Sequence, residues 1–445
     1  MHHAGIQTPD LIIPLLCGML QCTSPDRVET WDWAIFRSAE KWSAHGAIVA
    51  ATRPYLPSSF DRPPRNIAEK LTSGYKVAEF LMYLYGLGPA LLFGVLPMPY
   101  WRNLCKMIRG VRIISRYKKQ SGISRQDLAE AHKLLCEFVL EFEDLYYQRK
   151  ISCIHFVRQS IHVYIHLAAE MINTGPYTIK SQWPIERTIG ILGGQIRQPS
   201  KPFANLAQRA IRRCQVNALK HIFPSMDPDA YRPTLPQGAY DVGDGYVLKR
   251  YRDKTPHILR ECEADVLRTF VHSRQMIASP EWLTSPAVIR WARLQLPTEQ
   301  LAGAWKEKEK NLTDRCTRRM VEIVHNGEVE MAEVYFYFFL DLEEDVARHE
   351  REAYALISII GPPDPELLEL SYYTFWSCLP TGDDGLAIIN VKAIQATVAI
   401  IPHEIDIIDD LQLRERVRGR WFMVPELGAD VGALAGVRDN LDDDD

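Results

Sequence analysis

The sequence lacks the cysteine pairs that mark disulfide-rich proteins and metal-binding fingers. Its nine cysteines are an odd number and contain no Cys-x-x-Cys pair. Scattered single cysteines favour a reducing compartment over an extracellular one. The chain also has no Gly-x-x-x-x-Gly-Lys-Ser/Thr loop, no Gly-x-Ser-x-Gly elbow and no His-Glu-x-x-His motif. Nothing therefore indicates a P-loop nucleotide hydrolase, a serine hydrolase of the elbow type or a zinc peptidase.

A long apolar run without helix breakers is missing as well. Residues 80–101 carry no charge and are long enough to span a bilayer, but Gly and Pro residues interrupt them. We expect this segment to form two short buried helices, with turns at Gly86–Pro89 and Leu96–Pro99. No membrane partner is expected.

The formal net charge of −4 hides an uneven distribution along the chain. Residues 1–100 contain 8 basic and 8 acidic side chains, residues 101–220 contain 20 and 8, and residues 221–445 contain 24 and 40. The three parts therefore carry net charges of 0, +12 and −16. A strongly basic central part indicates a polyanionic partner such as DNA.

One carboxylate stands alone in this basic part. Glu186 is the only acidic residue between Glu170 and Asp227, and the basic residues that follow it are Arg187, Arg197, Lys201, Arg209, Arg212, Arg213 and Lys220. Positive surroundings keep a carboxylate ionised, and Mg²⁺ prefers ionised carboxylate ligands. Two interpretations stay open: Glu186 binds a catalytic metal ion, or it pairs with Arg187 or Arg197 and orients its helix.

The basic run itself has a helical arrangement. Several of Arg209, Arg212, Arg213 and Lys220 share one side of a helix, and uncharged donors such as Asn205 and Gln208 accompany them. Such a surface suits contacts with phosphates more than reading of bases. The alternative is an ordinary solvated helix face.

A histidine pair forms the other candidate site. His162 and His166 are four residues apart, on one face of an expected helix, and Cys153 and His155 precede them. Such a pair can chelate Zn²⁺, with Cys153 or His155 as a third ligand. The alternative is that the histidines form structural hydrogen bonds.

Helical periodicity dominates the first 225 residues. We expect helices at 124–150 with Ser124 as the N-cap, at 151–173, at 183–193 and at 203–222. Another helix is expected directly after Ser24–Asp26, where Pro25 suits a first helical turn.

The later part of the chain has a different character. Residues 226–330 are expected to form a linker and a helical segment over 257–325, and residues 431–445 an acidic tail. Residues 331–430 contain β-branched and aromatic runs separated by turn signals, which predict a small antiparallel β-rich domain. The expected fold class is α+β, a mainly helical N-terminal and central region (1–225) followed by this β-rich domain.

Long motifs in a fixed order carry a family resemblance over roughly residues 20–225. They are Tyr55–Lys76, Tyr85–Pro89, Glu141–Arg149, Ile154–His162, Gln182–Gly190, Ile196–Arg209 and Arg213–Leu219. Together they resemble transposases of fungal (basidiomycete) CACTA-like DNA transposons of the Plavaka type. A looser resemblance continues to Pro362–Leu368.

The resemblance implies an RNase H-like core in which two Asp and one Glu bind two Mg²⁺ or Mn²⁺ ions. It makes Glu186, followed by Arg187, the third catalytic acid, and it implies histidines shortly before that acid, where His162 and His166 lie. The first two acids should lie on strands, but no strand pattern precedes about residue 235. The nearby aspartates with any claim to these positions are Asp26, Asp32 and Asp61.

We therefore expect a nuclear, transposase-derived DNA-binding protein whose RNase H-like sheet is missing and whose active site is incomplete. One alternative is an active metal-dependent nuclease or strand-transferase. Another is a non-catalytic interaction scaffold, in which the acidic C-terminal part binds a partner or masks the basic centre. A homo-oligomer is compatible with each of the three.

Overall fold

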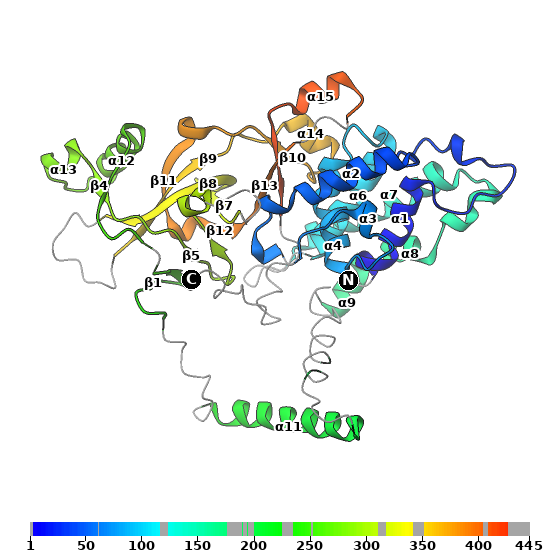
Figure 1. Cartoon of the computed structure of the whole chain (residues 1–445), viewed down its shortest axis with the longest axis horizontal. Helices are drawn as coiled ribbons and strands as arrows, with labels where there is room; N and C mark the ends of the chain where they lie inside the picture. The colour runs from blue at the N-terminus through cyan, green and yellow to red at the C-terminus, as the bar shows by residue number, and fades with distance from the viewer. Residues whose placement is uncertain are drawn as a thin grey trace.

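The computed structural model describes residues 3–60, 62–115, 123–175, 200–224, 235–250, 252–309, 317–340, 351–403 and 408–425, together with Ile189 and Gly194. Helices make up the regular structure of the described chain up to residue 224, and strands begin at Tyr240 (Figure 1). All described strand pairs are antiparallel. The α+β class predicted from the sequence is therefore confirmed.

The N-terminal and central part is built from α-helices and from shorter 3-10 or π-helical turns, labelled η. Its elements are η1 (His3–Gln7), α1 (Pro9–Cys17), η2 (Val28–Thr30), α2 (Ala39–Ala51), η3 (Arg53–Tyr55), η4 (Ser58–Phe60), α3 (Ile67–Lys70), α4 (Val77–Leu81), η5 (Met82–Leu87), α5 (Gly88–Leu91), α6 (Met98–Ser115), α7 (Arg125–Phe142), η6 (Glu143–Tyr147), η7 (Ile151–Phe156), α8 (Gln159–His162), α9 (Tyr164–Thr174) and α11 (Pro202–Ile222).

The later part combines strands with short helices. Its elements are β1 (Tyr240–Gly243), β2 (Tyr246–Leu248), β3 (His257–Ile258), α12 (Glu261–Ser273), α13 (Pro280–Thr284), β4 (Ala287–Val288), β5 (Leu294–Gln295), β6 (Leu301–Ala302), η9 (Trp305–Glu309), β7 (Met320–His325), β8 (Glu328–Phe339), β9 (Ala353–Ile359), α14 (Pro365–Leu370), β10 (Trp376–Cys378), η11 (Gly382–Gly385), β11 (Leu386–Asn390), η12 (Val391–Ala393), β12 (Ile394–Thr397), β13 (Ala399–Pro402), α15 (Leu411–Val417) and β14 (Trp421–Val424).

The predicted cap of helix α7 is confirmed. The Ser124 hydroxyl accepts the backbone N–H of Asp127 at 3.0 Å, and the Asp127 carboxylate accepts the N–H of Ser124 at 3.3 Å. This reciprocal pair satisfies two amides that a helix start leaves without helical partners. The helix predicted after Ser24–Asp26 is wrong: only the three-residue 3-10 turn η2 follows, and the Asp26 carboxylate accepts the Trp31 indole N–H at 2.8 Å. The second long helix begins at Ala39 instead, with Ser38 as its N-cap.

Two other helical predictions need correction. The expected helix at 151–173 is divided into η7, α8 and α9, and Ile154 in η7 is 56% exposed. Within the described residues 257–309 and 317–325, the segment is helical only in α12, α13 and η9. Between them, Leu294 and Leu296 are buried and Gln295 is half-buried, an alternation with the period of a strand.

The uncharged segment 80–101 is buried inside the helical part. Helices η5 and α5 follow one another without a turn at Gly86–Pro89, contrary to prediction, whereas a break does precede α6 at Met98. Within the described ranges, no helix combines the length and the apolar character that crossing a membrane requires.

The largest sheet has five strands in the order β11-β9-β8-β7-β12. Successive residues of β9 face two different cores: Ala353, Ala355 and Ile357 face the four-stranded sheet β1-β2-β5-β6, and Tyr354 and Leu356 face helix α12. Because neighbouring side chains of a strand point to opposite faces, β9 is buried on both sides. This explains its continuously apolar sequence.

The C-terminal segment also enters the core of the helical part. A three-stranded sheet, β10-β14-β13, contributes Ala399, Ile401, Phe422 and Val424 to the cluster that contains most of the buried residues of α1 to α9. The Arg112 guanidinium of α6 donates to the carbonyl oxygens of Tyr85 and Thr374 at 2.7–2.9 Å. Residues far apart in the chain therefore share one core.

A buried carboxylate, that of Glu79, anchors the segment around Arg65 to this core. The side chain of Glu79 is fully buried and accepts hydrogen bonds from the Arg65 guanidinium at 2.6 and 2.7 Å and from the backbone N–H of Lys76 at 2.9 Å. Burial raises the pKa of Glu79, but the bonds from Arg65 and from the backbone outweigh it and leave the pKa lowered. The ionised form therefore stabilises the fold.

We predict that Arg65→Ala lowers the free energy of unfolding at pH 7 by about 3 kcal/mol, because it leaves a buried charge without its main partner. Since the folded-state pKa of Glu79 is lowered, the wild-type advantage is fully present above the unfolded pKa of Glu, about 4.3. It shrinks as the pH falls through the folded pKa. Urea denaturation of the wild-type chain and of Arg65→Ala measures the difference in the free energy of unfolding at pH 7 and at pH 4. Arg62, 3.8 Å from Glu79 and half-exposed, is the matched control; an equal loss in Arg62→Ala would contradict this account.

Candidate nucleic-acid interface

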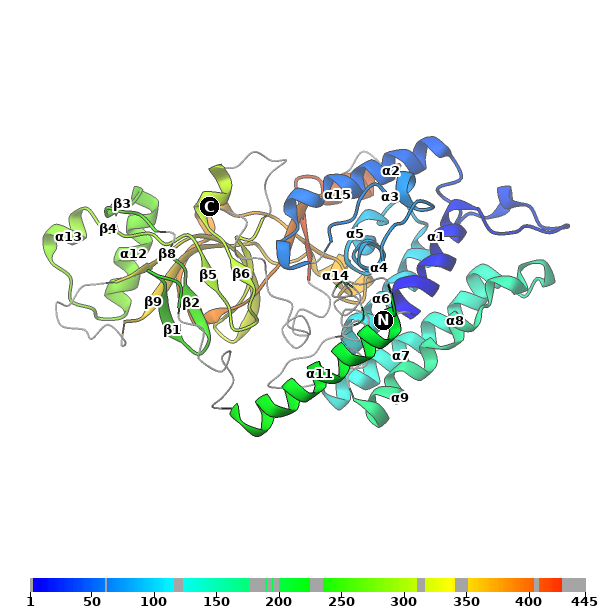
Figure 2. The same cartoon turned by 60° about the horizontal axis from the view of Figure 1, so that its bottom comes forward.

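Helix α11 carries the basic run, and its local sequence explains its limits. Pro202 occupies the first turn, where a missing N–H costs nothing, and Pro224 follows the helix end. Alanine, leucine, glutamine and arginine, which are strong helix formers, fill the interior. The predicted helix at 203–222 is confirmed. None of its described residues is buried, and Figure 1 shows the helix separated from the sheets and the other helices in that view, whereas in the turned view of Figure 2 it passes in front of the helical part.

The two sides of α11 differ in chemistry. At about 100° per residue, Asn205, Arg209, Val216 and Lys220 form one row along the helix. The opposite side carries no Lys, Arg, Asp or Glu and includes Phe203, Ala207, Ile211, Cys214, Ala218, His221 and Ile222. The helix therefore presents its cations in one direction only.

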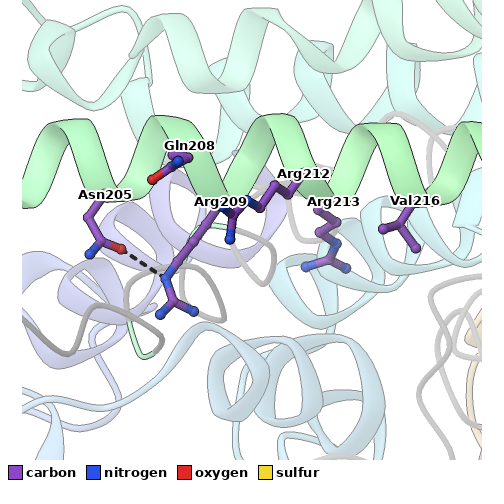
Figure 3. Close-up of a pocket in the computed structure, with 6 residues that line it drawn as sticks. All are labelled: Asn205, Gln208, Arg209, Arg212, Arg213 and Val216. Carbon is purple, nitrogen blue, oxygen red and sulfur yellow. Dashed lines mark hydrogen bonds between the residues drawn. The ribbon is translucent and has the colours of Figure 1, made fainter.

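A shallow open hollow runs along the basic side (Figure 3). Its lining residues are Asn205, Gln208, Arg209, Arg212, Arg213 and Val216. The Asn205 side-chain oxygen accepts a hydrogen bond from Arg209 Nε at 2.8 Å. This bond fixes the direction of the Arg209 side chain, whose two terminal nitrogens form the other edge of the guanidinium group.

The basic residues of α6 have a different environment. The Lys106 ammonium lies 2.8 Å from a Glu137 carboxylate oxygen and also pairs with Glu141, and Arg109 Nε lies 2.8 Å from Glu130. The side chains of Lys106 and Arg109 are 7% and 17% exposed, and Arg112 is buried. These cations of the +12 segment therefore hold the fold together and do not face a ligand.

The structure describes only some of the predicted site residues. Glu186, Arg187, Arg197 and Asp61 lie outside the described residues. Lys201 directly precedes α11, and Arg209, Arg212, Arg213 and Lys220 lie on it. The four α11 residues are thus brought onto one helix, as the sequence predicts.

The two described aspartates have structural partners. The Asp26 carboxylate accepts hydrogen bonds from the Trp31 indole at 2.8 Å and from the Cys153 thiol at 3.1 Å. Burial raises the pKa of Asp26, but these bonds outweigh it and lower the pKa. The Asp32 carboxylate accepts the Tyr100 hydroxyl at 2.6 Å. Both aspartates lie in the helical part, and neither is on a strand.

The histidine pair is formed, but without the expected third ligand. His162 Nε2 and His166 Nε2 lie 3.1 Å apart, and both side chains are exposed. Cys153 donates to Asp26, and His155 Nε2 lies 2.7 Å from the Gln21 carbonyl oxygen. Within the described part of the chain, no three His, Cys, Asp or Glu side chains gather as a metal site would require.

The sequence did not allow us to predict which cations are paired inside the protein and which are exposed. A signal was present: Glu130, Glu137 and Glu141 lie at helical spacings of seven and four residues on α7, which packs against α6. Acids repeated on one face of a neighbouring helix indicate partners for the α6 cations. The place of Val216 in the hollow was also missed, because an isolated valine among polar residues carries no such signal.

Comparison of the chain with models of protein families, with curated proteins and with solved structures gives no match.

We predict that the purified chain contains less than one zinc ion per molecule, because a stable zinc site needs three or four protein ligands and the His162–His166 pair supplies two. Elemental analysis after dialysis measures the zinc content, with Cys153→Ala as the control for the candidate third ligand. One zinc ion per chain, lost in His162→Ala but retained in Cys153→Ala, would show that ligands elsewhere complete the site.

Proposed function

We propose that this chain is a transposase-derived nuclear protein that binds DNA through the basic side of α11. In this proposal, residues 1–225 correspond to the helical part of an RNase H-like transposase. The family resemblance supports the transposase origin, and the net charge of +12 over residues 101–220 supports a polyanionic ligand.

One observation carries the proposal: the contrast between α6 and α11. The cations Lys106, Arg109 and Arg112 are largely or fully buried and hydrogen-bonded within the protein. On α11, by contrast, no residue is buried, and the helix sequence contains no acidic residue. Arg212 and Arg213 are exposed, and Arg209 and Lys220 are half-buried on the same side of the helix. Cations gathered in this way bind phosphates by releasing the condensed counterions of the nucleic acid.

The proposal assigns no independent catalysis to the chain. Asp26 and Asp32 hold hydrogen bonds with Trp31 and Tyr100, which gives them structural roles. In a complete enzyme of this family, Glu186 would bind Mg²⁺ or Mn²⁺ together with two strand-borne aspartates, and the metal ions would stabilise the charge that develops on the transferred phosphate. A homo-oligomer on DNA is compatible with the proposal.

We predict that reversing Arg209, Arg212 and Arg213 to Glu weakens DNA binding at least tenfold at about 0.1 M salt. Fluorescence anisotropy with a 30-base-pair duplex measures the affinity. Since α11 contributes nothing to the core, the melting temperature should stay the same. The matched control reverses Arg125, Lys133 and Lys150, which are exposed cations outside α11, to Glu. Equal affinity of the α11 variant and the control would contradict the proposal.

We also predict that the chain does not nick supercoiled DNA in Mg²⁺ or Mn²⁺, because the described candidate acids Asp26 and Asp32 are hydrogen-bonded to Trp31 and Tyr100 and neither lies on a strand. An agarose-gel assay of the wild-type chain and of Glu186→Gln tests this expectation. Metal-dependent nicking that disappears in Glu186→Gln would instead support an active nuclease.

A further inference from the structure

The arrangement of side chains around α11 carries information about the shape of its ligand. This inference rests on the proposed function, because it assumes that the basic side of α11 contacts DNA. We infer that α11 enters the major groove of B-form duplex DNA, with the row Asn205, Arg209, Val216 and Lys220 facing the floor of the groove.

The size of α11 fits this groove. Its 21 residues make a rod about 31 Å long and about 10–12 Å wide with its side chains. The major groove of B-DNA is about 12 Å wide, whereas the minor groove is about 6 Å wide. No described side chain of α11 is buried: Gln208, Arg212, Arg213 and Val216 are exposed, and Asn205, Arg209 and Lys220 are half-buried.

Two consecutive arginines define the edges of the basic side. Arg212 and Arg213 follow one another and therefore point about 100° apart, roughly 50° to either side of the row. In a groove, such side chains reach the phosphates of opposite strands, while the row between them faces the base edges. A helix lying across a single backbone would need only one of these two directions.

The side chains of the row carry groups that can contact the edges of bases. The bond from Arg209 Nε to Asn205 leaves the terminal edge of the Arg209 guanidinium directed into the hollow (Figure 3). That edge matches the O6 and N7 acceptors of guanine in the major groove. Val216 lines the same hollow and offers an apolar surface to a thymine methyl group.

The opposite side of α11 is consistent with one-sided insertion. Phe203, Ile211 and Ile222 lie there and are 85%, 58% and 63% exposed. An uncharged, apolar back cannot favour phosphates, so DNA meets the helix from the basic side only. Recognition helices of DNA-binding proteins likewise use one side to contact the base edges in the major groove.

Groove-specific competition on the full chain tests the inference. We expect methyl green, which occupies the major groove, to displace the protein from a 30-base-pair duplex, and netropsin, which occupies the minor groove, to leave it bound. Duplex RNA of the same sequence should compete at least tenfold more weakly, because its A-form major groove is too narrow for side chains to read. Arg209→Lys, which keeps the charge but loses the fork, should weaken binding about tenfold more than Arg212→Lys does.

The outcomes separate this inference from the proposed function. Displacement by netropsin but not by methyl green, or equal competition by duplex RNA, would overturn the groove assignment. If the variant with Arg209, Arg212 and Arg213 changed to Glu still lost affinity in that case, DNA binding by α11 would stand. Unchanged affinity of that variant would overturn both.

Discussion

The buried guanidinium of Arg112 joins three separate parts of the chain. From α6 it donates to the carbonyl oxygens of Tyr85 and Gly86 at the end of η5, and to that of Thr374 just before β10. A buried charge persists only where such bonds replace its hydration. The bonds therefore require the C-terminal segment to return to the helical core, and Phe375, Ala399, Ile401, Phe422 and Val424 pack there.

This constraint decides which cations remain for a ligand. Once α6 lies between η5, α7 and the C-terminal segment, Lys106, Arg109 and Arg112 all have partners inside the protein. Arg102 of the same helix is exposed, but its guanidinium also has a partner within the chain: it lies over the Tyr372 ring and donates to the Tyr372 hydroxyl at 3.0 Å. Among the described residues of the central segment, some cations therefore stabilise the core, whereas those of α11 and others such as Arg125, Lys133 and Lys150 lie outside it. A count of charges does not distinguish cations that stabilise the core from cations on the surface, whereas the packing of their side chains does.

Local signals in the sequence predicted local structure well. The Ser124 cap, the α7 helix and the α11 helix follow from short-range patterns, because caps and helical periodicity are encoded within a few residues. Long-range contacts were not predictable in this way. The structural role of Asp26 depends on Cys153, 127 positions away, and the strands β3 to β6 have two residues each, too few to give a clear alternation. Helix α11 was predicted correctly because its charged residues recur at helical spacing within a short stretch of sequence.

The salt dependence of DNA binding tests the central claim most directly. If Arg209, Arg212 and Arg213 each neutralise a phosphate, their simultaneous replacement by Ala should flatten the slope of log Kd against log salt concentration by about 2 to 3. The same replacement of Arg125, Lys133 and Lys150 should leave the slope unchanged. Equal slopes for the wild-type chain and the α11 variant would contradict the claim that this helix is the DNA-binding surface.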